Sequence, residues 1–473
     1  MTVAVAAPHP DAVEAARAVV ADGGNAFDAA LAAAAALTVA YPHQCSVGGD
    51  LVAMVRPAHS PVRAVLSIGA AARAVDVAAL GDRMPVRGPQ TVTVPGVVAG
   101  WAAVHGLGAR LPLGKLLAFS VRLAADGVDV APGLRAAIAA GSDVIRADPG
   151  LSAVMLQPRL VQQALAETLA AIGRDWRSFY TGPIVAGVRA LGSPLAEEDF
   201  AAHVAEVGDP LRTVVGGVTW HAAPPPVQGA TFLAVAGSRS LLADSRRAQS
   251  ARDAFLGDPR SGPIPLSNLL LRTPEQASPV PEPRPPSAPD RMRRASGDTV
   301  AVTAVDDEGN AIALIQSVFE SFGAGLLEPS TGVVLHNRGS SFRLDPSHPG
   351  HIAPGVRPPH TLCPAIATTA DSVIALGCQG GRAQPWILAQ LASEVLSADD
   401  PGELVARPRW ILRGDDLMLE PGVPVPPGAD GLTVTTVPGP HDDAGHVQMS
   451  RSRSGRLDAG SDPRADGLAA VLP

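Results

Sequence analysis

The sequence has very little of several residue types that mark common classes of protein. Lys115 is its only lysine, 3% of its 473 residues are aromatic, and it contains three cysteines. The net charge of -8 is spread along the chain without a basic block, which argues against a nucleic-acid partner. The longest apolar stretch, residues 29–40, is too short and too rich in alanine to cross a bilayer, so no membrane partner is expected.

The cysteines and the first ten residues point to a reducing compartment. Cys45, Cys363 and Cys378 are odd in number, lie far apart and form no Cys-x-x-Cys pair, which favours buried structural roles over catalytic ones. The N-terminal segment lacks a cationic region, and Pro8 and Pro10 interrupt its apolar run before it could serve as a signal peptide. We therefore expect a cytoplasmic protein.

The first third of the chain predicts helices packed on a sheet. Residues 10–21 and 26–39 each predict a helix, and the intervening Gly23 and Asn25 supply the signals that end the first and cap the second. A glycine turn then enters a β-rich run at residues 46–55. Further expected elements are helices through 101–105, 116–125 and 134–140, and a strand at 217–223; between 201 and 271 the signals are otherwise weak.

A proline-rich segment is followed by an expected β-hairpin. Residues 273–297 contain seven prolines, several charges and almost no apolar periodicity, which predicts an exposed connector. β-Branched residues then alternate over 299–305, acidic residues and Gly309 suit a turn over 306–310, and a second apolar run follows over 311–318. The turn lacks the ligand spacing of a calcium loop, so a plain turn is preferred.

Thr299 begins this hairpin directly after the connector, where it is a candidate N-terminal nucleophile. A threonine hydroxyl needs a nearby base, and the α-amino group of the same residue can serve once the preceding bond is cut. Cleavage between Asp298 and Thr299 would create that group. A threonine at the start of a strand after a linker is common, so this feature alone leaves a simple interdomain linker open.

Ordered motifs over most of the chain resemble those of the γ-glutamyltranspeptidase family. The resemblance begins with Gly-Gly-Asn-Ala-Phe-Asp-Ala-Ala, continues through a Gly-Gly turn and a Val-Pro-Gly element, and includes the processing threonine itself. So many matches in the family order make coincidence improbable. The matching segments are 23–30, 48–50, 94–101, 299, 305–310, 322–325, 357–358, 364, 377–381, 408–409 and 460–464.

The resemblance implies an α+β fold, namely the four-layer αββα sandwich of the N-terminal-nucleophile hydrolases. It implies a large-subunit segment, 1–298, that ends in the connector, and a small-subunit segment, 299–473, the two forming one intertwined body. After processing these fragments would be a heterodimer, with a dimer of heterodimers as an open alternative. No cofactor is implied.

Catalytic roles follow from the same resemblance. Thr299 would be nucleophile and, through its amine, general base, while Ser317 takes the place of a family hydroxyl that bonds the nucleophile and assists processing. Gly380 and Gly381 would offer backbone N–H groups to the developing oxyanion. The implied reaction transfers the acyl group of a γ-glutamyl, glutathione-type amide through an acyl-enzyme to water or an amine.

The usual substrate anchors of the family are mostly missing. Its arginine position falls at Gly69, its aspartate position at Ser341, and its serine pair at His360 and Thr361. Arg338, in the same loop as Ser341, could fork a substrate carboxylate instead, as could Arg73, although Arg73 suits a solvated surface better.

The departures from the family leave two alternatives to a γ-glutamyl amidase. One is an acylase for another carboxylate-bearing amide of glutaryl type, and the other is an inactive relative that serves as a binding protein. His360 is expected to act as a donor on the substrate side. His348, His351 and His360 lie among prolines without a further ligand at metal-binding spacing, so no metal site is expected.

Overall fold

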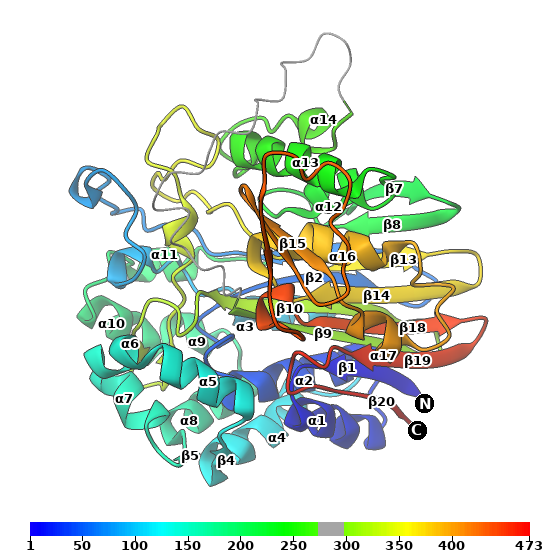
Figure 1. The fold of residues 1–473 in the computed structure, drawn as a ribbon. Helices are drawn as coiled ribbons and strands as arrows, with labels where there is room; N and C mark the ends of the chain where they lie inside the picture. Colours follow the sequence, from blue (N-terminus) through cyan, green and yellow to red (C-terminus); the bar gives the residue numbers. More distant parts are fainter. Residues whose placement is uncertain (273–297) are drawn as a thin grey trace.

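The chain folds into four layers in the computed structural model, which describes residues 1–272 and 298–473. Two sheets pack face to face, and helices cover the outer face of each (Figure 1). The predicted αββα class is therefore confirmed, whereas the expected connector at 273–297 lies outside the described residues. The covering helices are α1 (Pro10–Ala21) and α2 (Ala26–Ala40) on one side, and α12 (Gly229–Val235), α13 (Leu241–Phe255) and α16 (Gln384–Ala392) on the other.

The first sheet has seven strands, and the predicted hairpin forms its centre. Its order is β20-β1-β9-β10-β2-β3-β6, with every neighbouring pair antiparallel. The strands, in that order, are Leu468–Leu472, Val3–Ala7, Asp298–Asp306, Ala311–Phe319, Asp50–Arg56, Arg63–Ser67 and Glu206–Gly208.

The second sheet has six strands in the order β19-β18-β14-β13-β8-β7. Both sheets take strands from both sides of residue 298, so the segments before and after that residue share one body. The strands, in that order, are Arg456–Ser461, Val447–Arg453, Ser372–Cys378, Ala365–Thr368, Val218–Ala222 and Leu211–Val215.

Alternation along β9 decides where Thr299 points. Val300 and Val302 belong to the core shared with helices α1 and α2, whereas Ala301 and Val305 belong to the core between the two sheets. Since side chains alternate with a period of two along a strand, Thr299 faces the space between the sheets, on the same side as Ala301. That placement buries it, and only 2% of its surface is exposed.

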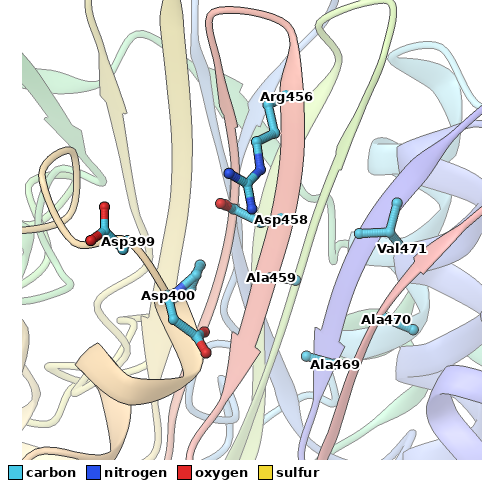
Figure 2. A pocket seen from close by; sticks show the side chains of 9 residues that line it. Asp399, Asp400, Arg456, Asp458, Ala459, Ala469, Ala470 and Val471 are labelled. Carbon is cyan, nitrogen blue, oxygen red and sulfur yellow. The ribbon is translucent and has the colours of Figure 1, made fainter.

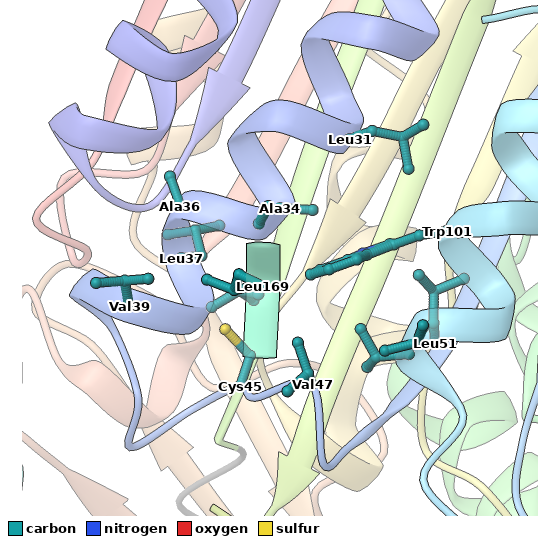
Figure 3. Packing of buried hydrophobic residues seen from close by; sticks show 14 of the residues in the cluster. Leu31, Ala34, Ala36, Leu37, Val39, Cys45, Val47, Leu51, Trp101 and Leu169 are labelled. Atoms are coloured by element: carbon teal, nitrogen blue, oxygen red, sulfur yellow. The ribbon is translucent and has the colours of Figure 1, made fainter. Parts of the chain in front are cut away.

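Helix α2 supports this sheet from behind. Every residue of the helix is buried, and its many alanines bring its backbone close to the strands (Figure 3). The Asn25 side chain accepts hydrogen bonds from the amides of Phe27 and Asp28, and the Asp28 carboxylate accepts one from the Asn25 amide, which forms a capping box. The predicted helices at 10–21 and 26–39 are thus confirmed to within one residue.

The other helices predicted in the first third of the chain are present, but some begin or end a few residues away from the predicted bounds. The helix expected at 101–105 is part of α3 (Val97–Gly106), and those at 116–125 and 134–140 match α4 (Leu113–Asp126) and α5 (Pro132–Ala140). No helix among the described residues is long and apolar enough to span a membrane. Other elements are α6 (Ser142–Ala147), α7 (Pro149–Met155), α8 (Gln163–Arg174), α9 (Ser178–Thr181), α10 (Pro183–Ala190), α11 (Glu197–Ala201), α14 (Leu266–Leu269), α17 (Pro401–Ala406), β4 (Val128–Asp129), β5 (Arg159–Leu160), β11 (Leu327–Glu328), β12 (Val333–Val334), β15 (Trp410–Arg413), β16 (Asp416–Leu419) and β17 (Thr433–Thr436), with short 3-10 turns between them.

Candidate active site

Thr299 and Ser317 are directly opposite each other on β9 and β10. The strand register pairs Thr299 with Ser317, and Ser317 in turn with Asp50 on β2. The Thr299 hydroxyl donates a hydrogen bond of 3.0 Å to the Ser317 Oγ. The register shifts between Ser317 and Phe319, so the pairing becomes irregular beside this hydroxyl pair. The sheet therefore holds the two side chains together at the point where β9 begins.

The Ser317 hydroxyl also reaches the peptide bond that precedes Thr299. It donates a hydrogen bond of 2.7 Å to the carbonyl oxygen of Asp298 and accepts one of 2.9 Å from the amide of Phe319. A continuous path thus runs from the Thr299 hydroxyl through Ser317 to the Asp298 carbonyl. A donor on that oxygen polarises the carbonyl, and the path gives the nucleophile's proton a route to it.

The Asp298 side chain is buried beside other acidic groups. Its exposed fraction is 5%, and its Oδ2 has no hydrogen-bond partner among the described residues. Burial raises the pKa of Asp298 well above its ordinary value, and the nearby charges of Asp442 and Glu320 raise it further, against smaller opposing effects of a hydrogen bond from the Ser321 amide and of the charge of Arg87. The carboxyl group is therefore uncharged under conditions in which an exposed aspartate is ionised.

Gly380 and Gly381 follow strand β14 at a sharp turn. Their φ angles of 148° and 53° are ones that residues with a Cβ rarely adopt, and a Cβ at Gly380 would lie 2.6 Å from Cδ1 of Ile387. Within the described parts of the chain, neither glycine amide donates a backbone hydrogen bond. The loop thus presents two N–H groups that are available to an anion.

Two residues that the sequence did not single out fix this loop. Gln228 Nε2 donates to the carbonyl of Gly381 at 2.9 Å and to that of Thr361 at 2.5 Å. Arg252 donates to Gln228 Oε1 at 3.1 Å and to the carbonyl of Arg382 at 2.8 Å. Gln228 and Arg252 therefore tie the glycine turn to the segment that carries Thr361. No local pattern identifies them, because they meet the turn only in the folded chain.

His360 lies under the site, and both of its ring nitrogens are engaged by protein groups. Its Nε2 is 3.2 Å from Asp50 Oδ2, and its Nδ1 accepts a hydrogen bond of 3.3 Å from the Leu362 amide. Burial and the charge of Arg338 lower the pKa of His360 to about 3, so the ring is neutral. In this arrangement the imidazole orients Asp50. The sequence led us to expect that His360 donates to the substrate, but neither of its ring nitrogens is free in this structure.

Asp50 is the buried anion of this region. Besides His360 it faces His336, whose Nδ1 is 3.5 Å from Asp50 Oδ2, and it accepts a hydrogen bond of 3.0 Å from the Gly69 amide. Burial alone would raise the pKa of Asp50, but the two imidazoles lower it below its ordinary value. Asp50 is therefore ionised and holds the segments that carry His336, His360 and Gly69 together.

Arg338 is buried without a carboxylate partner among the described residues. It is 1% exposed, its guanidinium lies 3.8 Å from the ring centroid of Phe319, and both of its terminal nitrogens are 3.4 Å from the Thr361 hydroxyl. Burial lowers the pKa of Arg338 to about 9, which still leaves it charged at neutral pH. A buried cation without an ion pair is costly. The ring on which this guanidinium packs belongs to Phe319, two residues after Ser317.

The other predicted substrate residues divide between the site and the scaffold. Thr361 accompanies Arg338, whereas the Ser341 hydroxyl is 2.8 Å from each of the carbonyl oxygens of Arg338 and Pro359, to which it can donate. Ser341 thus joins the two loops. Arg73 is exposed and donates to the carbonyl of Glu198, which confirms the surface alternative.

A buried ion pair anchors the loop that leads to His360. Arg357 binds Asp258 through its amide at 2.9 Å and through its guanidinium at 2.8 Å, and its NH1 lies 2.8 Å from Glu206. Burial would raise the pKa of Asp258, but hydrogen bonds from Arg357 and Arg260 lower it to about 2. The loop is therefore fixed by charge as well as by packing.

His348 and His351 each place a ring nitrogen against a backbone carbonyl oxygen. His348 Nε2 lies 2.8 Å from the carbonyl oxygen of Asp253, and His351 Nδ1 lies 2.8 Å from that of His348. In residues 1–272 and 298–473 no group of three or more His, Cys, Asp or Glu side chains is placed to hold a metal ion.

A surface cavity of about 350 Å³ lies elsewhere, where β19 and β20 meet the start of α17 (Figure 2). None of the predicted site residues lines it. Its walls carry three carboxylates, and its lining residues are Asp399, Asp400, Pro401, Arg456, Asp458, Ala459, Ala469, Ala470 and Val471.

Comparison with known proteins gives this arrangement a context. The profile of the family described as Gamma-glutamyltranspeptidase matches residues 12–472. The chain is 35% identical to the oxamate amidohydrolase proenzyme of Klebsiella pneumoniae, over 98% of this chain and 97% of that protein. It is 31% identical to the glutathione hydrolase-like YwrD proenzyme of Bacillus subtilis, over 86% of this chain and 84% of that protein.

Solved structures give the same picture. The cephalosporin acylase from Bacillus halodurans superposes with a TM-score of 0.85 at 27% identity, and the match covers 99% of this chain and 95% of that one. These similarities extend over nearly the whole chain, so they concern the complete four-layer body.

Proposed function

This chain belongs to the γ-glutamyltranspeptidase family of N-terminal-nucleophile amidohydrolases, and on that premise we propose that it matures by cutting itself between Asp298 and Thr299. Thr299 would then hydrolyse the amide bond of a small substrate that carries a carboxylate. The observation that carries the substrate proposal is the buried guanidinium of Arg338, which has no salt bridge among the described residues and packs on Phe319, whose amide donates to the Ser317 hydroxyl.

In the self-cleavage, Thr299 Oγ1 forms a bond to the Asp298 carbonyl carbon. Its proton passes to Ser317 Oγ while the Ser317 proton moves to the carbonyl oxygen, along the observed hydrogen bonds. The tetrahedral intermediate then breaks its C–N bond, and the proton of its hydroxyl goes to the Thr299 nitrogen. Water hydrolyses the resulting ester and frees the Thr299 hydroxyl, together with the α-amino group that turnover needs.

In turnover, that amine takes the proton of Oγ1 as the oxygen attacks the substrate carbonyl. Gly380 and Gly381 would donate their amides to the oxyanion, which lowers the barrier because the donors are already oriented. The leaving nitrogen takes the proton from the amine, and water then hydrolyses the acyl-Thr299 ester. Gln228 and Arg252 contribute by keeping the glycine turn in place.

Arg338 supports a carboxylate on the acyl part of the substrate. A guanidinium offers several donors in a planar fork that matches a carboxylate, and Phe319 and Thr361 already fix its orientation. A substrate anion would supply the ion pair that the described residues lack. Because Phe319 lies close in sequence to Ser317, the anchored carboxylate would be only a short distance from the scissile carbonyl.

The same region suits a γ-glutamyl group less well. The family's arginine position is Gly69, where a Cβ would lie 1.6 Å from the carbonyl oxygen of Val94, so no arginine fits this backbone. The family's aspartate position is Ser341, whose hydroxyl already lies within hydrogen-bonding distance of two backbone carbonyls. A substrate ammonium group would therefore lack its usual partner.

We therefore favour an amide of oxamate type, in which the carboxylate is attached directly to the amide carbonyl. The name of the Klebsiella pneumoniae relative supports this choice. A γ-glutamyl amide of glutathione type is the second candidate, favoured by the name of the Bacillus subtilis relative, and a glutaryl-type acylase is the third, favoured by the solved acylase. The hydroxyl path from Thr299 to Asp298 supports an active enzyme over a binding protein.

The mature enzyme in this proposal is a heterodimer of fragments 1–298 and 299–473, held together by the shared sheets. We place it in the cytoplasm, where thiols stay reduced, because its three cysteines are free and buried.

The test is a substrate comparison with the purified, matured protein. Oxamate, glutathione and a glutaryl amide are supplied separately, and the released ammonia or amine is measured. Preferred turnover of oxamate, abolished by Thr299→Ala, is expected. Preferred turnover of glutathione would overturn the substrate proposal while leaving the nucleophile intact, and equal turnover by the Thr299→Ala variant would overturn the nucleophile.

A further inference from the structure

Asp298, whose carbonyl is attacked in the proposed self-cleavage, has a buried side chain close to two other acidic groups. The inference drawn from this arrangement rests on the proposed function. Asp298 is both the residue whose carbonyl is attacked and a buried side chain at the first position of β9. We propose that Asp298 is a specificity-determining residue for self-cleavage, and that the chain cuts itself only while this side chain is uncharged. An ionised Asp298 would be expelled from its pocket.

The groups that face Asp298 are mostly anionic. Glu320, in the segment after β10, and Asp442, in the 3-10 turn before β18, both raise its proton affinity, and Arg87 is the cation that faces it. The guanidinium of Arg87 is already engaged by the carbonyl oxygens of Ser321 and Gly323, at 2.8 and 2.5 Å. No salt bridge joins Arg87 to Asp298 among the described residues, so the Asp298 carboxyl has a hydrogen bond from the Ser321 amide but no cation in contact with it.

Two histidines lie near Asp442, the anion that acts most strongly on Asp298. His446 Nε2 is 2.7 Å from Asp442 Oδ1, so its interaction is with Asp442 itself. Burial lowers the pKa of His43 to about 3, so His43 is neutral and supplies no positive charge. The surroundings of Asp298 therefore favour its neutral form.

The position of the side chain is coupled to the geometry of the bond. Asp298 pairs with Phe319 across the irregular step in the register, and its carbonyl oxygen accepts the Ser317 hydroxyl at 2.7 Å. An ionised carboxylate would gain hydration by leaving the interior, and because the side chain and the carbonyl belong to one residue, we expect that movement to draw the carbonyl away from Ser317. The proton path from Thr299 to that carbonyl would then be broken. Charge on the side chain would thus stop the attack without altering the nucleophile.

A neutral side chain of the same shape should therefore replace Asp298. Asparagine keeps the size and the planar group but carries no charge at any pH, so Asp298→Asn separates the need for shape from the need for a proton. Glu320→Gln removes one of the two anions and lowers the proton affinity of Asp298, which moves its ionisation to lower pH. Glu308→Gln is a matched control, since Glu308 lies at the opposite end of the same hairpin and pairs with Arg110.

The experiment follows self-cleavage of the full-length chain after cell-free synthesis, from pH 5 to pH 10, by the appearance of the two fragments on a denaturing gel. For the native chain, the rate relative to that of Asp298→Asn should be constant at low pH and fall about tenfold per pH unit once Asp298 ionises. Glu320→Gln should move the onset of this fall to lower pH, and Glu308→Gln should not move it.

The outcomes distinguish the inference from the function on which it rests. A native chain that is cut at the same rate relative to Asp298→Asn over the whole pH range would overturn the requirement for an uncharged side chain, while the nucleophile would stand. Failure of Asp298→Asn to cut at any pH, while the native chain cuts, would also overturn it, because the acid itself would then be needed. No cutting of the native chain at any pH would overturn the proposed self-cleavage.

Discussion

The hydroxyl oxygens of Thr299 and Ser317 lie 3.0 Å apart, and the Ser317 hydroxyl donates a hydrogen bond of 2.7 Å to the Asp298 carbonyl oxygen. A second pair of threonine and serine hydroxyls lies further along β9. Thr303 and Ser450 have their hydroxyl oxygens 2.9 Å apart, and Ser450 donates to the Thr303 carbonyl at 3.1 Å. The first pair spans the bond that precedes a candidate nucleophile, whereas the second ties the two sheets together away from it.

Removal of the Ser317 hydroxyl should slow self-cleavage selectively. Ser317→Ala deletes the donor on the Asp298 carbonyl and the path for the Thr299 proton, and loss of one such donor costs roughly 100-fold in rate. Fragment formation by the purified precursor, followed over time on a gel, measures this loss. Ser450→Ala is the control, because it removes a buried hydroxyl that also contacts a threonine hydroxyl of β9 and donates to a β9 carbonyl. Equal slowing by both substitutions would mean that Ser317 acts only through the fold.

Arg338 should determine the preference for acidic substrates. Arg338→Met leaves an apolar side chain of similar length, and the loss of a charge-assisted hydrogen bond of about 1.5–3 kcal/mol should lower kcat/KM for oxamate about 10- to 100-fold. A neutral amide of the same size should lose far less. Arg73→Ala, which removes an exposed arginine, should leave both values unchanged. The account of the substrate fails if the acidic and neutral amides are affected equally.

Gln228 should affect turnover more than substrate binding. Gln228→Ala releases the carbonyl of Gly381 and should displace the glycine amides, which lowers kcat about tenfold or more with a smaller change in KM. Gln390→Ala is a matched control, because Gln390 also bridges two backbone carbonyls, those of Trp386 and Trp410. A loss confined to KM would contradict the proposed role.

The Asp258–Arg357 pair should stabilise the fold at neutral pH. The pKa of Asp258 is lowered from its ordinary 3.8 to about 2, so its contribution is present above the ordinary value and is lost as the pH falls towards 2. At about 1.4 kcal/mol per pH unit, Asp258→Asn should cost about 2 kcal/mol in unfolding free energy at pH 7. Denaturant titrations of both proteins at pH 7 and near pH 2 measure this difference, which should shrink at the lower pH.

Local signals in the sequence were sufficient for the elements that carry them. Helices α1 and α2 begin and end where the proline, glycine and asparagine signals predict, because capping is a short-range interaction. The hairpin was also predictable, since β-branched alternation and an acidic turn are both local. By contrast, helix α13 lies in a region with weak signals: it carries several charges along its length, and its N-cap residue Ser240 makes no side-chain cap.

The site was predictable only where a single segment or a family motif carries it. Thr299, Ser317, Gly380 and Gly381 came from motifs, and their roles remain predictions. The clamp of Gln228 and Arg252 could not be foreseen, because its contacts with the glycine turn join residues more than 100 positions apart. Nor does the sequence indicate that His360 contacts Asp50, since such a contact depends on how distant segments pack.

The most direct test of the account is the N-terminal sequence of the smaller fragment that the purified protein yields on a denaturing gel. The account predicts a fragment that begins Thr299-Val300-Ala301 and is absent from the Thr299→Ala variant. A chain that stays intact after long incubation, or a fragment that begins at another residue, would contradict the assignment of Thr299 as the nucleophile.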